Sequence, residues 1–187
     1  MPSLSEADRK AILELARQAV VEAVCRNRQL TEIPTGGVFS ARCGAFVTLH
    51  LQKRLHGCIG VIDSKQLLGE TIAHCARSAA VDDPRFSRIQ PTDLTALKIE
   101  VSLLSPLELI RPEDVIIGQH GLLIESGAYR GLLLPQVAVE HHLDRERFLR
   151  ETCYKAGLPG DAWQASQTRL YGFTCEVFAE PGYHQEK

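Results

Sequence analysis

The sequence lacks long apolar runs, basic runs and any secretory leader pattern, and each absence excludes a class of protein. No apolar run in the 187 residues approaches the roughly 20 that a membrane-spanning helix needs, so no membrane segment is expected. The N-terminal stretch MPSLSEADRK lacks the charged-then-apolar pattern of a signal peptide, which favours a cytoplasmic protein. The net charge is −2 and no Lys/Arg stripe is present, so nucleic acid is not an expected partner.

Cysteine pairs are also missing. The six cysteines are scattered singly, with no Cys-x-x-Cys pair. In a cytoplasmic chain this spacing indicates free thiols rather than a disulfide framework. It also lacks the ligand spacing of a structural zinc site, so no metal is expected. The glycine pair in IPTGG lacks the further glycines and the lysine of a phosphate-binding loop, so the sequence indicates no nucleotide cofactor.

What is present is a regular succession of helix-like and strand-like segments. Residues 3–27 repeat apolar side chains at helical spacing, and SLSEAD offers two alternative capping boxes, Ser3 with Glu6 or Ser5 with Asp8. The stretch from Ser64 to Pro84 predicts a second helix, with Ser64 as N-cap and Pro84 as stop. Helical sequence returns at 135–156, broken where Asp144 caps a new helix.

Strand-like runs surround these helices in a pattern that occurs twice. Runs at 45–51 and 54–62 favour a hairpin, and 96–104 alternates as a half-buried strand. Runs at 121–126, 130–136 and 168–178 repeat the strand–strand–helix–strand order. We therefore predict an α+β fold in a single domain, residues 1–187. Its two repeats, about 38–103 and 114–178, are expected to share one mixed, barrel-like sheet with the helices packed outside and an additional N-terminal helix.

Several stretches occur together in order from about residue 33 to residue 178: IPTGGVF, LHGCIG, DDPRF, HGLLIESGAYRGLLLPQVAVE and FLRETCYKAGL. Together they resemble the AMMECR domain family, whose prokaryotic members are called AmmeMemoRadiSam system protein A. The resemblance implies an α+β fold with two structural repeats and defines no activity. It also implies Memo-type and radical S-adenosylmethionine proteins as partners, because genes of the family often neighbour theirs. This chain has His56 where the family usually has Arg, and Leu143 where it usually has Trp.

The LHGCIG run supplies the leading candidate site. In a strand, His56, Cys58 and Gly60 share one face while Gly57 lies on the other. His56 would then adjust the reactivity of the Cys58 thiol, Gly60 would leave space beside the sulfur, and Gly57 would admit a ligand or another backbone. The alternative is that Cys58 is a small buried apolar side chain.

Two further stretches carry candidate binding residues, each with a plainer explanation. In DDPRF, Arg85 can bind a carboxylate or phosphate, or it can brace the helix stop together with a neighbouring aspartate. In LLLPQVAVEHH, Gln136 and Glu140 lie on one helical face near the end of a strand and are candidate ligand contacts. Metal binding by the histidines that follow is disfavoured, because adjacent helical side chains point about 100° apart.

Two functions follow from these observations. The first is a cysteine-dependent enzyme, or catalytic subunit, that acts on a small polar metabolite. In it Cys58 is the nucleophile or redox thiol, His56 adjusts it, and Arg85 or Gln136 orients the substrate. The second is a non-catalytic subunit that docks a protein partner or presents a substrate. Thiol reactivity separates the two.

Overall fold

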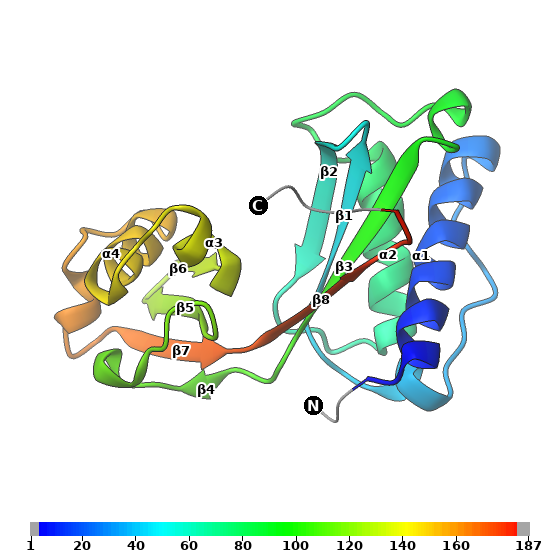
Figure 1. Cartoon of the computed structure of the whole chain (residues 1–187). Coiled ribbons are helices and arrows are strands. Elements are labelled where there is room, and N and C mark those ends of the chain that lie inside the picture. Colours follow the sequence, from blue (N-terminus) through cyan, green and yellow to red (C-terminus); the bar gives the residue numbers. More distant parts are fainter. Residues whose placement is uncertain (1–3, 183–187) are drawn as a thin grey trace. The chain divides into compact units, whose positions relative to one another are not determined.

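The structure of the chain is a computed structural model that describes residues 4–182 (Figure 1). It divides into two compact units. The first contains the described residues up to Leu104 together with those from Glu176 onward, and the second contains Ser105–Cys175. The α+β class is confirmed, and each unit is built around its own four-stranded sheet.

The first unit is a sheet with both of its long helices on one face. Its elements are α1 (Glu6–Arg26), β1 (Ala45–Leu51), β2 (Arg54–Val61), α2 (Leu68–Val81), β3 (Leu97–Leu104) and β8 (Cys175–Ala179), and the strand order is β2-β1-β3-β8. Figure 1 shows α1 and α2 side by side against the sheet, and apolar side chains of both helices and of β1 and β3 form one buried cluster. The edges of this sheet are therefore β2 and β8.

Local sequence explains the start of α1. The Ser5 side chain accepts a hydrogen bond from the Asp8 amide at 3.1 Å, and the Asp8 carboxylate accepts one from the Ser5 amide. The second of the two capping boxes is thus confirmed, whereas Ser3 lies outside the described residues. The helix buries an apolar stripe against α2 and the sheet: Ile12, Leu15, Ala16, Ala19, Val20 and Ala23.

The hairpin of β1 and β2 turns at Gln52 and Lys53, whose φ values of 51° and 65° fit a two-residue turn with both central residues in the left-handed region. Pairing is regular from the turn as far as His50 with Leu55, and then shifts so that Leu49 lies opposite Gly57. The residue passed over is His56, which makes a bulge in β2. This shift decides which residues of β2 face the helices.

The expected N-cap of α2 is wrong. The helix begins at Leu68 after Leu67, whose amide donates to the Glu70 carboxylate at 3.0 Å. Ser64 is buried, and its hydroxyl lies 2.7 Å from the Thr71 hydroxyl, so it is engaged inside the fold rather than at the helix end. The predicted stop at Pro84 is confirmed, since the helix ends at Val81.

The second unit has a similar plan. Its elements are β4 (Glu108–Leu109), β5 (Gly121–Ser126), β6 (Tyr129–Leu133), α3 (Pro135–Glu140), α4 (Arg145–Lys155) and β7 (Arg169–Phe173), and the strand order is β4-β7-β5-β6. As predicted, Asp144 caps α4 by accepting from the Arg147 amide at 2.9 Å. The chain leaves α4 through Gly157, whose φ of 74° suits glycine.

The single barrel-like sheet is the prediction that the structure corrects. There are two separate antiparallel sheets, because the strand expected at 168–178 divides at Thr174 into β7 of one sheet and β8 of the other. At this division the Ser105 amide donates to the Thr174 carbonyl and the Thr174 amide donates to the Ser105 hydroxyl, each at 2.9 Å. The hydroxyl of Ser105 therefore takes the place of a backbone partner and ends the ladder.

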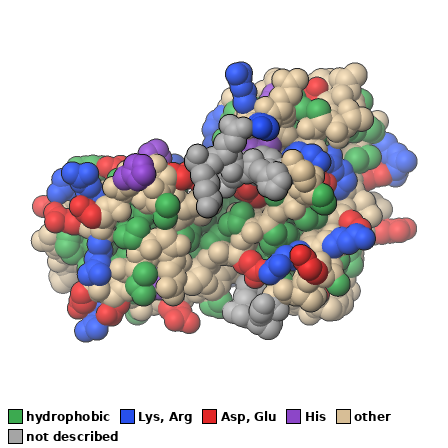
Figure 2. Space-filling model, viewed as in Figure 1, with side chains coloured by type: hydrophobic (Ala, Val, Ile, Leu, Met, Phe, Trp, Pro, Cys, Tyr) green, Lys and Arg blue, Asp and Glu red, His purple; other side chains and the backbone are tan. Residues whose placement is uncertain are grey.

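Buried apolar side chains form two clusters, one in each unit. The single cooperative domain therefore stays a prediction, which limited proteolysis between residues 104 and 113 tests. Within the described part of the chain, no helix is long and apolar enough to cross a membrane. On the face drawn in Figure 2, basic and acidic side chains are interspersed rather than gathered into a patch of one sign.

Candidate functional site

The Cys58 side chain lies on the face of the first sheet that α1 and α2 leave uncovered. A β-carbon at Gly57 would lie 2.2 Å from the carbonyl oxygen of Ala79 in α2, so Gly57 faces the helix and permits its close approach. Strand alternation then directs Cys58 to the opposite face. There Thr48 of β1 pairs with Cys58 on one side and with Glu100 of β3 on the other, which makes a polar row across three strands.

Two groups approach the thiol of Cys58, which is half-buried. The Thr48 hydroxyl donates toward Sγ at 3.3 Å. The Arg85 guanidinium donates to the Cys58 carbonyl at 2.7 Å. The pKa of Arg85 is raised, chiefly by its hydrogen bond to Asp83 and in smaller part by Cys58. A half-buried cysteine with a hydroxyl donor at its sulfur and a cation at its carbonyl differs from the fully buried cysteines and is the candidate for thiol chemistry.

The DDPRF segment covers the open edge of β2. The buried Asp83 carboxylate accepts from the Cys58 amide at 2.9 Å and from the Arg85 guanidinium at 2.7 and 2.9 Å. The hydrogen bond from Arg85 holds the pKa of Asp83 well below its usual range. Asp83 and Arg85 together satisfy the outward N–H and C=O of Cys58, which would otherwise be unpaired at a sheet edge.

Arg85 is therefore both a brace and a group within reach of ligands. The Asp–Arg pairing expected of the bracing alternative is present. The side chain of Arg85 nevertheless remains 56% exposed, and within residues 4–182 its Nη1 donates no hydrogen bond. A ligand-binding role for Arg85 stays a prediction, and one face of the guanidinium is available for it.

The expected space beside the sulfur at Gly60 is not open. A β-carbon at Gly60 would lie 2.1 Å from the ring of Phe46, the residue opposite it in β1. The ring covers the glycine, so Gly60 is explained by packing, and the expectation of an unfilled gap at this position is wrong. Ligand contact with Gly57 or Gly60 stays a prediction.

His56 has neighbours other than the thiol. Its Nε2 lies 3.4 Å from the Ser87 hydroxyl, and its ring stacks on Phe86 with centroids 6.0 Å apart. Both partners follow Arg85 in the loop after α2. The bulge turns His56 out of the regular alternation. In the described contacts, the neighbours of Cys58 include Thr48 and Arg85 but not His56. The influence of His56 on the thiol stays a prediction.

The remaining cysteines have different surroundings. No disulfide joins any of the six cysteines, all of which lie within residues 4–182. Burial raises the pKa of the Cys43 and Cys153 thiols, and it raises that of Cys75 to about 12. Cys25 is exposed on α1, and among residues 4–182 no hydrogen bond to its sulfur is present. Thiolate chemistry near neutral pH is therefore disfavoured at the three buried positions.

Gln136 and Glu140 both belong to α3 in the second unit, whereas Cys58, His56 and Arg85 belong to the first. Gln136 is half-buried and Glu140 is exposed. Their role in ligand binding stays a prediction. Over residues 4–182, no three or more His, Cys, Asp or Glu side chains are grouped so that they could hold a metal ion.

Sequence reasoning missed Thr48, Glu100 and Phe46. The alternation of AFVTLHL already puts Phe46 and Thr48 on one face of a strand. What the alternation does not supply is the pairing register, which makes Thr48 rather than Val47 the neighbour of Cys58.

Comparison with known proteins gives consistent results along most of the chain. The AMMECR1 family model matches residues 13–178. A protein of Thermococcus kodakarensis is 46% identical over 182 residues, which cover 90% of this chain and 88% of that protein. One from Methanothermobacter thermautotrophicus is 40% identical over 96% of this chain and 97% of its own. The crystal structure of an uncharacterized protein from Pyrococcus horikoshii superimposes with a TM-score of 0.84 at 40% identity, over 91% of this chain and 90% of that one.

Proposed function

The chain belongs to the AMMECR1 family, and from that premise we propose that it is a thiol-dependent enzyme, or catalytic subunit, for a small polar metabolite. The observation that carries the proposal is the position of Cys58. The residue is half-buried, its sulfur accepts from the Thr48 hydroxyl at 3.3 Å, and the Arg85 guanidinium donates to its carbonyl at 2.7 Å. These are the two kinds of neighbour that stabilise a thiolate, the reactive form of cysteine.

Each neighbour has a defined part in this proposal. Thr48 donates its hydroxyl proton toward Sγ. Arg85, paired with Asp83, holds an exposed guanidinium edge near the residue. The unoccupied Nη1 of Arg85 is suited to a carboxylate or phosphate of the substrate. The substrate class is therefore a small anionic molecule with an electrophilic atom that reaches Sγ.

A second function is favoured by a separate observation. Gly57 is explained by the approach of α2, and Gly60 by the ring of Phe46. Both glycines would be required by the fold even if no reaction took place at Cys58. Under this alternative the chain is an accessory subunit that docks a partner or presents a substrate. In either case we propose a cytoplasmic setting with Memo-type and radical S-adenosylmethionine proteins as partners, in keeping with the resemblance of the motifs.

Alkylation by iodoacetamide tests the proposal. In this reaction the S–C bond forms as iodide leaves, and the thiol proton passes to solvent. Mass-spectrometric mapping at pH 7 is expected to show Cys58 labelled first, ahead of the exposed Cys25 and well ahead of Cys75 and Cys153. Arg85→Gln is expected to slow labelling of Cys58 and to leave Cys25 unchanged. Labelling of Cys58 no faster than Cys75 would remove the support for a thiol enzyme and leave the accessory subunit.

A further inference from the structure

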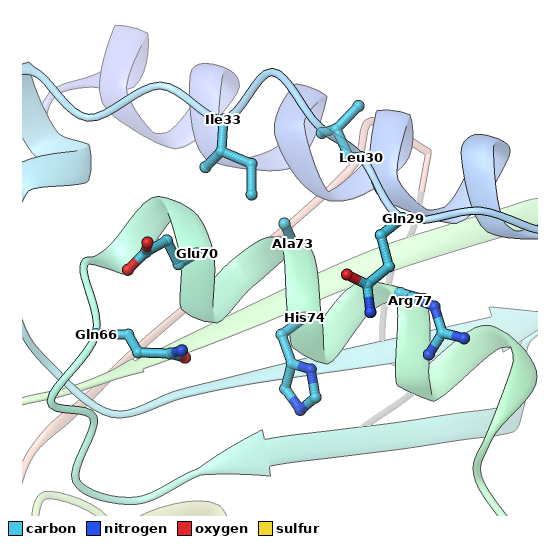
Figure 3. A pocket seen from close by; sticks show the side chains of 8 residues that line it. All are labelled: Gln29, Leu30, Ile33, Gln66, Glu70, Ala73, His74 and Arg77. Carbon is cyan, nitrogen blue, oxygen red and sulfur yellow. The ribbon is translucent and has the colours of Figure 1, made fainter.

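A cavity in the first unit lies on the outer side of α2, and Cys58 is not among its lining residues. Its volume is about 420 Å³, and its walls are α2 and the segment 29–33 that follows α1 (Figure 3). Pockets for small molecules are commonly of about this size, 300–1,000 Å³, and combine an apolar surface with a few convergent polar groups. Both features are present here.

The apolar part comes from both walls. Figure 3 shows Ile33 directed from the segment toward α2 and the methyl group of Ala73 directed from α2 toward the segment, whereas the Leu30 side chain points away from α2 and lines the cavity at its edge. Ala73 is buried, while Leu30 and Ile33 are half-buried. Together they give the cavity a floor for aliphatic groups.

The charged part is a row along α2 with opposite signs at its ends. Glu70, His74 and Arg77 are separated by four and three residues, so they lie on one side of the helix. At 1.5 Å per residue, the backbone positions of Glu70 and Arg77 are about 10 Å apart along the axis. The cavity is therefore acidic at one end and basic at the other.

The polar groups retain capacity for a ligand. Glu70 accepts from the Leu67 amide through one carboxylate oxygen, which leaves the other. Arg77 donates to Asp82 through Nη1 alone. Within the described residues, the side chains of Gln29, Gln66 and His74 make no hydrogen bond, although all three line the cavity (Figure 3).

We propose that this cavity binds a short zwitterionic peptide, with its ammonium group at Glu70 and its carboxylate at Arg77 and His74. The aliphatic side chains of the ligand lie on Leu30, Ile33 and Ala73. An α-amino acid carries both charges on one carbon, whereas the ends of the cavity are two helical turns apart. A dipeptide separates its charges further and fits the row better. The site is distinct from Cys58 and does not depend on thiol chemistry there.

The probe is the dipeptide L-alanyl-L-leucine, compared with its N-acetylated form and its C-terminal amide. Titration followed by amide chemical shifts is expected to perturb segment 29–33 and residues 66–77, and each blocked form is expected to bind at least about tenfold more weakly. Glu70→Gln is expected to remove the preference for the free ammonium group, and Arg77→Gln the preference for the free carboxylate. Glutamine at position 70 can still cap the helix, so α2 is retained in the first variant.

Asp82→Asn is the matched control. It breaks the same ion pair as Arg77→Gln but leaves the cation in place, so dipeptide affinity is expected to stay within about twofold of the unmodified chain. The proposal is overturned if no shifts occur in the two segments at about 10 mM dipeptide. It is also overturned if the blocked forms bind equally well, or if Asp82→Asn weakens binding as much as Arg77→Gln does.

Discussion

In both units an outer strand pairs with its hairpin partner, which pairs in turn with a third strand. The side chains at one row of this pairing are polar in the first unit and mainly apolar in the second. In each, a glycine of an outer strand lies against a helix: Gly57 against Ala79, and Gly131 against Ala156. The residue after that glycine begins a row across three strands. In the first unit the row is Cys58, Thr48 and Glu100; in the second it is Leu132, Leu123 and Tyr171.

The comparison separates what the fold requires from what it does not. Both units also place a phenylalanine ring over a glycine, Phe46 over Gly60 and Phe173 over Gly121. These two pairs lie in different strands, Gly60 and Phe46 in β2 and β1 but Gly121 and Phe173 in β5 and β7, so only the glycines against the helices, Gly57 and Gly131, occupy equivalent positions. The polar row is not required by the pairing, because the second unit forms the corresponding row with two leucines and a tyrosine. A polar row that the fold does not need is the strongest indication that the Cys58 face has a function.

The largest effect is expected where the two units agree. Gly57→Val and Gly131→Val each force a side chain into backbone atoms 2.2–2.3 Å away, so each is expected to lower the free energy of unfolding by about 3 kcal/mol. Gly36→Ala is the control, since no atom lies within 4 Å of the new β-carbon. Urea denaturation measures all three, and equal losses for the three variants would contradict a shared close approach of helix to strand.

The next effect concerns the brace that only the first unit has. Asp83→Asn is expected to lower the free energy of unfolding by about 2 kcal/mol at pH 7. This value is reduced for solvent screening, because the Arg85 side chain is largely exposed. The folded-state pKa of Asp83 lies below its unfolded value, so its contribution is present above the unfolded pKa of about 4 and is lost as pH falls toward the folded value. The difference in free energy of unfolding between the unmodified chain and Asp83→Asn should therefore become smaller as the pH falls from about 5 to about 3. Urea denaturation at each pH measures it.

A difference that stays constant from pH 7 to pH 3 would contradict this account of Asp83. Asp82→Asn serves as the control for general charge effects, because Asp82 is partly exposed and contacts neither Cys58 nor Arg85 in the described hydrogen bonds.

A smaller effect on stability is expected when the row that begins at Cys58 is given the apolar side chains of the row that begins at Leu132. Cys58→Leu combined with Thr48→Leu gives the first unit the apolar pair of the second, and the free energy of unfolding is expected to change by no more than about 1.5 kcal/mol. Circular dichroism and urea denaturation check this. Loss of the folded state would mean that the polar row is structural and would weaken the functional argument.

The smallest effect expected is on the thiol itself. Thr48→Val keeps the shape of the side chain but removes the hydroxyl donor, so alkylation of Cys58 at pH 7 is expected to slow about threefold. Rates for Cys25 serve as the internal reference. An unchanged rate at Cys58 would show that the hydroxyl makes no difference to the sulfur.

Sequence periodicity and caps predicted the helices well, because these signals are local. Ser5 with Asp8, and Asp144 with its helix, were readable as caps. The prediction of Ser64 as a cap is wrong, because its hydroxyl pairs with that of Thr71 only once the chain has folded. The division of the last strand at Thr174 also depends on a partner distant in sequence, Ser105.

At the candidate site, the motif identified Cys58, but pairing decided its neighbours. Unbroken pairing from the turn at Gln52 and Lys53 would put Cys58 opposite Val47; the bulge at His56 moves it opposite Thr48. The sequence of the strand alone predicts His56 beside Cys58 and open space at Gly60, because it contains neither the bulge nor the ring of Phe46. The contacts of Arg85 and Phe46 come from elements that the strand's own sequence does not describe.

The most direct test uses the second unit as its own control. Leu132→Cys places a thiol at the position equivalent to Cys58 but opposite Leu123, without a hydroxyl donor beside it. Competitive iodoacetamide labelling at pH 7, read by mass spectrometry in this single variant, compares the two thiols under identical conditions. We predict that Cys58 is labelled at least about tenfold faster than the thiol at position 132. Equal rates would contradict the claim that the polar row makes Cys58 a reactive centre.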